Sequence, residues 1–434
     1  MKKLFLLILS VILPLSAQYK ITAYKGALIY PVEGAPVENG VMIIQNGKII
    51  SVGREGEIAI PNGAEVIDVS GKVIIPGLVD THSHIGNGDG GDGSAPLHPD
   101  VRILDSIDPM SDTFMRARTG GITTVNVMPG SGHLMSGQTV YLKLRKSNII
   151  NGMLFCDDPI NGICGGLKMA NGTNSLRGTP FPGTRGKSAA LVRQLFIKAK
   201  EYREKKIAAG NDKSKMPAYD YEMESLVEVL DGRRIVQHHT HRADDIMTVL
   251  RLQKEFGFKV VLHHVSEGYK VAKEIAEAKI PCSIIIIDSP GGKLETMNLY
   301  FDNGVKMAEA GVDIAYHTDD YITDSRLFLR SAALGIRAGL RPEKALESLT
   351  LAGARMLGLE SRIGSLVKGK DADFVILSGD PFSVYTKIEK TVVEGVVVYD
   401  RSNPDDFKFA TGGYRVYKDL YYEHIHCGHD EELH

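Results

Sequence analysis

Two histidines separated by one residue, His82 and His84, follow directly after the apolar run at residues 74–79. Successive side chains of an extended strand point to opposite faces, so residues at i and i+2 project together. Neutral imidazole is the commonest metal ligand in proteins. The spacing therefore predicts a two-nitrogen metal clamp at the end of a buried strand, with a chance His-x-His on a surface loop as the alternative.

Four further apolar runs place ionisable side chains at or just beyond their ends. These side chains are Lys168, the pair His239 and His241, His264 and Asp319. Such groups are costly on buried strands unless they are paired or bind a metal. We therefore expect them to be paired or bound to a metal, at the same ends of the strands as the first two histidines. Alternation leaves either residue of the pair 239 and 241 as a ligand, and it places His263 and His264 on opposite faces.

The chain between residues 76 and 360 alternates strand-like runs with helical periods, which predicts an α/β fold of the (β/α)8 TIM-barrel type. Active sites of this fold lie at the carboxyl ends of the strands. After the first run, which ends at residue 84, the expected strands lie at 122–128, 152–156, 163–169, 234–241, 259–264, 280–287 and 312–317, with helices at 243–256, 268–278 and 299–310.

Short β segments with tight turns flank this central part at both ends of the chain. Asn46-Gly47 is a strong hairpin signal because both residues tolerate positive φ, and Glu394-Gly395 marks a second turn. We expect these segments, within residues 18–75 plus 361–402, to join into one small β-sandwich domain beside the barrel at 76–360. Residues 170–233 form a long insertion of the kind that serves as a lid or substrate wall, and 403–434 are expected to be a polar C-terminal tail.

The first residues read as a secretory signal peptide, with a basic start, an apolar stretch and small residues near position 17. We therefore expect export to the periplasm or medium, with no stable membrane anchor after cleavage. The net charge of −2 gives no indication of nucleic acid as a partner, so a small-molecule substrate is expected, and a homo-oligomer is left open. Cys156 and Cys164 are expected either to pair or to stay as buried thiols.

Several motifs together resemble the metal-dependent amidohydrolase superfamily, and within it imidazolonepropionase-like and prolidase-like proteins. The resemblance covers essentially the whole chain after the leader. Its carriers are Pro-Gly-Leu-Val-Asp-Thr-His-Ser-His at 76–84, Gly-Leu-Lys-Met at 166–169, His-Thr-His-Arg-Ala-Asp-Asp at 239–245, Ser-Glu-Gly-Tyr-Lys at 266–270, His-Thr-Asp at 317–319 and Gly-Ser-Leu-Val-Lys-Gly-Lys-Asp-Ala-Asp-Phe-Val at 364–375.

The resemblance implies a zinc centre, with two ions per chain, that hydrolyses a carbon–nitrogen bond in a peptide-like or cyclic amide. It implies His82 and His84 on one ion, His239 and His264 on the second, and Lys168 carboxylated by CO₂ to a bridging carbamate. Asp319 is implied as a ligand and as the catalytic acid and base.

Three nearby residues, His241, Arg242 and Asp320, are expected to contact the substrate or to orient the ligands. Arg242 stands where the deaminase branch of the family usually has a carboxylate, which counts against deamination. Two alternatives to the two-ion hydrolase are kept. One is a one-ion imidazolonepropionase-like or deaminase-like enzyme with unmodified Lys168, and the other is an inactive barrel that acts as a binding module.

Overall fold

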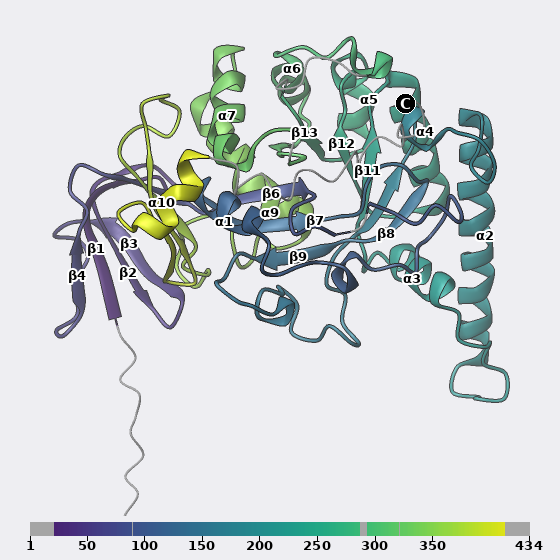
Figure 1. The fold of residues 1–434 in the computed structure, drawn as a ribbon, viewed down its shortest axis with the longest axis horizontal. Coiled ribbons are helices and arrows are strands. Elements are labelled where there is room, and N and C mark those ends of the chain that lie inside the picture. Colours follow the sequence, from purple (N-terminus) through teal and green to yellow (C-terminus); the bar gives the residue numbers. More distant parts are fainter. Residues whose placement is uncertain (1–20, 89, 287–292, 321, 413–434) are drawn as a thin grey trace, which may run out of the picture.

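The computed structural model describes residues 21–88, 90–286, 293–320 and 322–412 (Figure 1). The predicted signal peptide and residues 413–434 of the predicted tail lie outside this part of the chain. Within the described ranges, no helix has both the length and the apolar character needed to cross a membrane.

Strands from both ends of the chain form one eight-stranded sheet, at one end of the molecule in Figure 1. Its hydrogen-bonded order is β17-β16-β15-β5-β1-β2-β3, with β4 paired to β1. The first five strands are β1 (Ile21–Ile29), β2 (Val37–Gln45), β3 (Lys48–Arg54), β4 (Glu65–Asp68) and β5 (Val73–Pro76). The last three are β15 (Phe374–Leu377), β16 (Ile388–Val393) and β17 (Val396–Asp400). The predicted joining of the two chain ends is therefore observed, whereas a two-layer sandwich stays a prediction.

Both predicted hairpin turns in this sheet are confirmed. Asn46 and Gly47, with φ of 53° and 73°, connect β2 to β3, and Glu394 and Gly395, with φ of 49° and 76°, connect β16 to β17. Two successive residues with positive φ give the hairpin a turn whose twist matches that of its strands.

The central strands form two hydrogen-bonded groups, β6-β7-β9 and β14-β13-β12-β11-β10-β8. They are β6 (Leu78–Ser83), β7 (Ile122–Val127), β8 (Met135–Gln138), β9 (Val140–Lys143), β10 (Leu167–Ala170), β11 (Val236–Thr240), β12 (Val260–His264), β13 (Cys282–Ile284) and β14 (Ile314–Tyr316). The pairs β6–β7 and β10 through β14 are all parallel, and almost every residue in these strands is buried. The architecture is a TIM-barrel-like α/β fold.

The predicted third strand at 152–156 is wrong. A 3₁₀ turn occupies Ile150–Gly152, and Cys156 forms a disulfide with Cys164 across a Cα–Cα distance of 5.1 Å. Between β7 and β10 the fold instead contains β9 and β8. Strand β9 runs antiparallel to β7, and β8 runs antiparallel to β10. The sequence of β8, Met-Ser-Gly-Gln, is polar and contains glycine, so no apolar run predicts this strand.

Helices surround the central strands (Figure 1). They are α1 (Asp112–Thr119), α2 (Arg185–Ala209), α3 (Tyr221–Leu230), α4 (Ala243–Phe256), α5 (Ala272–Glu277), α6 (Asn303–Glu309), α7 (Phe328–Arg337), α8 (Pro342–Ser348) and α9 (Leu351–Leu357). The predicted helix at 243–256 matches α4 to the residue, and its end is set by Gly257 with φ of 76°. The insertion contains α2 and α3, and the predicted tail begins as helix α10 (Pro404–Thr411).

The first and last central strands meet where their carboxyl ends converge. The backbone N–H of Asp319 donates to the carbonyl of His82 at 2.9 Å, and Ser83 and Asp320 form a parallel bridge. Most of the predicted site residues lie at this end of the strands, which we call the mouth.

Candidate metal centre

A chain of hydrogen bonds orients His82. The ring nitrogen Nε2 of His263 lies 2.7 Å from the amide oxygen of Gln237, an acceptor, so His263 donates there and its Nδ1 is an acceptor. Nδ1 of His82 lies 3.2 Å from that atom and must carry the proton between them. Burial, the largest cause, keeps the pKa of His82 well below its usual value, so the ring is neutral. Its Nε2 therefore presents a lone pair to the mouth.

The second histidine of the clamp is oriented in the same way. Nδ1 of His84 lies 2.8 Å from the carbonyl oxygen of Met128 and donates to it. Its Nε2 therefore also presents a lone pair, 3.2 Å from Nε2 of His82. A carboxylate oxygen of Asp319 lies 3.1 Å from His84 Nε2 and 3.4 Å from His82 Nε2.

These three atoms fit the donor set of a divalent cation. All three offer lone pairs, so they repel one another at these distances unless a positive charge lies between them. Nitrogen and oxygen ligands of tetrahedral zinc, at 2.0–2.2 Å from the ion, lie about 3.3–3.6 Å from one another. The observed separations of 3.1–3.4 Å are close to that spacing.

Lys168 lies beside this donor set, at the end of β10. Its Nζ is 3.2 Å from His82 Nε2 and 3.1 Å from the sulfur of Met128, and its side chain is fully buried. Burial, the largest cause, lowers the pKa of Lys168 to about 7, against the opposing charge of Asp319. An amine with such a pKa is partly neutral at physiological pH and can act as a nucleophile.

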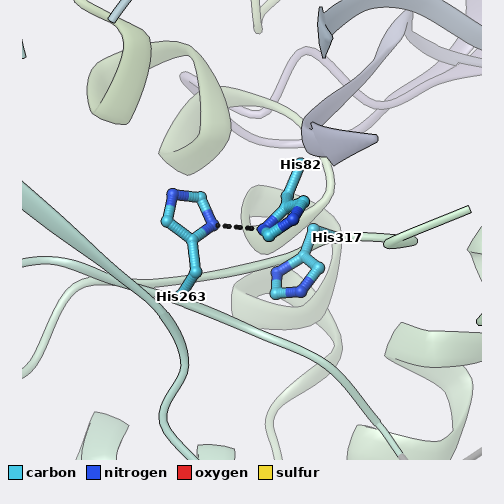
Figure 2. A group of neighbouring side chains, drawn as sticks. All are labelled: His82, His263 and His317. Atoms are coloured by element: carbon cyan, nitrogen blue, oxygen red, sulfur yellow. Dashed lines mark hydrogen bonds between the residues drawn. The ribbon is translucent and has the colours of Figure 1, made fainter. Parts of the chain in front are cut away.

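Two histidines that were not predicted as ligands, His263 and His317, border His82 (Figure 2). The ring of His317 stacks on that of His82 at 4.9 Å, and its Nε2 lies 3.1 Å from Nδ1 of His264. His317 precedes Asp319 by two residues, the same spacing as in the first clamp. That spacing was the sequence signal for it.

The expectation that His263 and His264 point to opposite faces is wrong. Both rings lie 4.8 Å from the ring of His82. Strand β12 ends at His264 with φ of 69°, and Val265 follows with φ of 49°. This left-handed turn breaks the alternation, and such strain in non-glycine residues is concentrated at functional sites. Asp319 is likewise left-handed, with φ of 50°.

The remaining predicted ligand, His239, lies with a different set. Potential ligand atoms within 4.8 Å of one another define one group of His82, His264 and Asp319, and another of His239, His241 and Glu295. Burial, the largest cause, lowers the pKa of His239 and of His241 well below the usual value, so both are neutral. Glu295 was not predicted.

Asp320 does not contact the histidines in any described interaction. The buried Arg116 donates to one of its oxygens, and the backbone N–H of Ser325 donates to the other at 2.9 Å. These bonds hold the loop that carries Asp319, which fits the expected orienting role. Arg242 instead lies on the surface, with its side chain 45% exposed and paired with Asp244 at 2.9 Å.

Comparison with known proteins places this centre in a family. The crystal structure of an amidohydrolase from Thermotoga maritima MSB8 is 35% identical, with a TM-score of 0.82, over 88% of this chain and 100% of that one. The chain belongs to the amidohydrolase family. A model of the amidohydrolase family also matches residues 229–399. This amidohydrolase is therefore a metal-dependent hydrolase that acts on carbon–nitrogen bonds.

Curated relatives agree at lower identity. Imidazolonepropionase from Fusobacterium nucleatum subsp. nucleatum is 22% identical over 80% of this chain and 87% of its own length. Amidohydrolase tasK from Hapsidospora irregularis is 25% identical over 88% of this chain, but this chain spans only 43% of that protein.

Proposed function

We propose that this amidohydrolase hydrolyses amide bonds in a peptide-like or cyclic amide, using two divalent ions, zinc in the first instance, in the mouth. The observation that carries the proposal is the convergence of His82 Nε2, His84 Nε2 and a carboxylate oxygen of Asp319 within 3.4 Å. Imidazole and carboxylate are zinc's common nitrogen and oxygen ligands.

The chemistry follows from the fixed donors. Bound divalent ions lower the pKa of water and polarise a scissile carbonyl. Asp319 accepts a proton from the attacking water at its carboxylate oxygen and then delivers it to the departing nitrogen. The backbone bond from Asp319 N–H to His82 and the bonds that hold Asp320 position that carboxylate, so little reorganisation is needed between the two proton transfers.

Lys168 is proposed to carry a carbamate. Its neutral amine would attack CO₂, forming an N–C bond and releasing one proton, and would leave an anionic oxygen pair beside His82. The lowered pKa of Lys168 supports the required neutral form. Reconstitution of metal-free protein with Zn²⁺, with and without bicarbonate, tests this step. Bicarbonate should tighten binding in the wild type and have no effect in Lys168→Ala.

Two further proposals concern the setting of the site. The bonds between the carboxyl ends of β6 and β14 support closure of the central strands into a complete (β/α)8 barrel, flanked by a small β-sandwich. The Cys156–Cys164 disulfide supports export, because disulfides persist in oxidising compartments. Mass spectrometry of alkylated protein from the periplasm or medium should find both cysteines unmodified before reduction.

The function is tested by turnover. Zinc-reconstituted protein is assayed against dipeptides, N-acyl amino acids and cyclic amides, with and without a chelator. We expect hydrolysis that requires metal and that is lost in His82→Asn, whereas His98→Asn, in a loop histidine bonded to the carbonyl of Asp92, keeps it. Turnover with one ion per chain would favour the one-ion enzyme, and binding without turnover across the panel would favour the binding module.

A further inference from the structure

Glu295 is a buried carboxylate on a loop that reaches into the mouth. It lies in the 3₁₀ turn Leu294–Thr296, between β13 and α6, and its side chain is 1% exposed. Its Oε2 accepts a hydrogen bond from the backbone N–H of Thr173 at 2.9 Å and lies 3.7 Å from a guanidinium nitrogen of Arg185. Its Oε1 is buried and has no hydrogen-bond partner among the described residues. A buried carboxylate oxygen without a partner is costly, which indicates that a ligand belongs there.

Two histidines at the end of β11 face the same place. Their rings are 4.6 Å apart, and their potential ligand atoms lie within 4.8 Å of one another and of a Glu295 oxygen. Nδ1 of His241 lies 2.7 Å from the hydroxyl oxygen of Ser266, which fixes the ring and leaves Nε2 pointing away from that bond. This Nε2 and both ring nitrogens of His239 are buried and have no hydrogen-bond partner in the described part of the chain.

The predicted partner of His239, His264, borders both donor sets. Its Nδ1 lies 3.1 Å from Nε2 of His317 and 3.9 Å from an oxygen of Asp319, whereas its buried Nε2 has no hydrogen-bond partner among the described residues and its ring lies 4.4 Å from that of His239. On the side of His239, the loop of Glu295 adds a carboxylate to the histidines of the strand ends. Two histidines and one glutamate form a recurrent zinc donor set, which leaves a fourth position open.

We propose that His239, His241 and Glu295 bind the second divalent ion of the centre, so that a loop carboxylate joins the strand-end histidines in holding this ion. The inference rests on the proposed function only in taking the mouth as a metal centre, and metal binding can be measured without substrate. It has a consequence for the insertion. Thr173 and Arg185, which contact Glu295, belong to residues 170–233, so the insertion positions the ligand.

The positive charge of Lys293 opposes a cation at this place, so its removal gives a control variant with the opposite expected effect on metal binding. Lys293 lies two residues before Glu295, and its charge adds to burial, the largest cause, in lowering the pKa of His239 and of His241. Removing this positive charge should tighten the second ion, whereas removing the charge of Glu295 should weaken it. Lys293→Gln thus tests for a cation on this side of the mouth, and Glu295→Gln tests whether this carboxylate holds it.

The experiment measures Zn²⁺ binding to metal-free protein by titration calorimetry, with elemental analysis after dialysis. The wild type should bind two ions per chain. In Glu295→Gln the Kd of the more weakly bound ion should rise by at least about 10–100-fold, because loss of even an outer contact to a ligand costs that much. The matched control is Asp245→Asn, a carboxylate with a 4% exposed side chain that Arg185 also binds, and it should bind as the wild type does. Lys293→Gln should bind the second ion more tightly.

Three outcomes would overturn the proposal. They are wild-type affinities for two ions in Glu295→Gln, loss of the second ion in His264→Asn but not in Glu295→Gln, and a wild type that binds a single ion. Circular dichroism confirms that each variant is folded, and His241→Gln carries the same test if Glu295→Gln does not fold. Two ions that depend on Glu295, without turnover of any amide, would reject the proposed function and leave this inference standing.

Discussion

Two buried groups of ionisable side chains in this amidohydrolase differ in how their charges are satisfied. In the mouth, lone pairs of histidines and of Asp319 face one another. At the junction of β9 with the terminal sheet, Nζ of the fully buried Lys143 binds Asp371, lies 2.9 Å from Asp373 and lies 3.2 Å from Glu394. The acceptors of the first group share one amine, Lys168, whose pKa burial lowers to about 7, whereas the second group contains its own lysine cation.

The difference shows how a buried polar cluster can be interpreted. In the Lys143 cluster, Arg145 binds both oxygens of Glu394 at 2.6 and 2.8 Å, and the backbone N–H of Glu394 donates to Asp373 at 2.7 Å. Such a network is complete and stabilises the fold. In the mouth, His239, His241 and His264 each retain a buried ring nitrogen without a described partner. A cluster that is incomplete in this way is suited to bind a ligand.

The largest effect is expected on catalysis, from Asp319→Asn. It removes the proposed acid and base, so kcat/KM should fall by about 10²–10⁴-fold. Asparagine tolerates the left-handed backbone at φ of 50°, so the melting temperature of the metal-free protein should change little. Steady-state kinetics and thermal melts measure the two quantities. Activity within tenfold of the wild type would show that Asp319 is not the proton carrier.

The complementary change, Lys143→Met, should act on stability. It leaves Asp373 buried without its cation, whereas Asp371 keeps Lys48 and Arg362, and this loss costs about 3–5 kcal/mol of unfolding free energy. The protein that remains folded should turn over normally, because Lys143 is not in the mouth. Urea unfolding measures the loss. Lys72→Met is the control, since Lys72 is 39% exposed and only 3.4 Å from Glu389. Equal losses in the two variants would contradict the comparison.

Metal should stabilise only through the mouth. Zn²⁺ at 100 times its Kd should raise the unfolding free energy by about 2.7 kcal/mol, because it binds the folded state. The increment from the first ion should disappear in His82→Asn, in which only the ion of His239, His241 and Glu295 can bind. Both increments should persist in Lys143→Met. Denaturant titrations with and without Zn²⁺ measure it. A total increment that is undiminished in His82→Asn would place the first ion elsewhere.

The charge cluster should also produce a pH dependence. Burial would raise the pKa of Asp371, but the charge of Lys143 and hydrogen bonds from Lys143 and Lys48 outweigh it and lower that pKa. The ionised carboxylate therefore stabilises the fold above its ordinary pKa of 3.8, and this contribution is lost as the pH falls through the lowered value. As the pH is lowered from 5 into the acid range, the unfolding free energy should fall more steeply in the wild type than in Asp371→Asn. Parallel curves would be the contrary result.

Much of the fold was predictable because its signals are local. The turns at 46–47 and 394–395, the helix at 243–256 and the polar ends of the buried strands each depend on a few neighbouring residues. The antiparallel segment β8–β9 was not predictable, since its orientation is decided by contacts with β7 and β10. A local pattern does not contain that information.

The same distinction applies to the candidate site. Residues at strand ends were found from the sequence, whereas Glu295 was not, because it lies in a 3₁₀ turn with no periodic pattern. His263 was set aside because the resemblance favours His264 and alternation was assumed to continue through His264, where the backbone turns left-handed. Arg242 was expected to contact the substrate or to orient the ligands, and the structure places it on the surface.

Arg242→Ala should have the smallest effect. It tests whether a residue that is close to the site in sequence also contacts the site in the folded protein. The side chain is 45% exposed and paired with a neighbouring residue, Asp244, so its loss should change unfolding free energy by no more than about 0.5 kcal/mol. Because no described contact joins it to the histidines, kcat/KM should stay near the wild-type value. A fall of tenfold or more, with KM raised and kcat unchanged, would mean that Arg242 binds substrate and that the mouth extends to this surface.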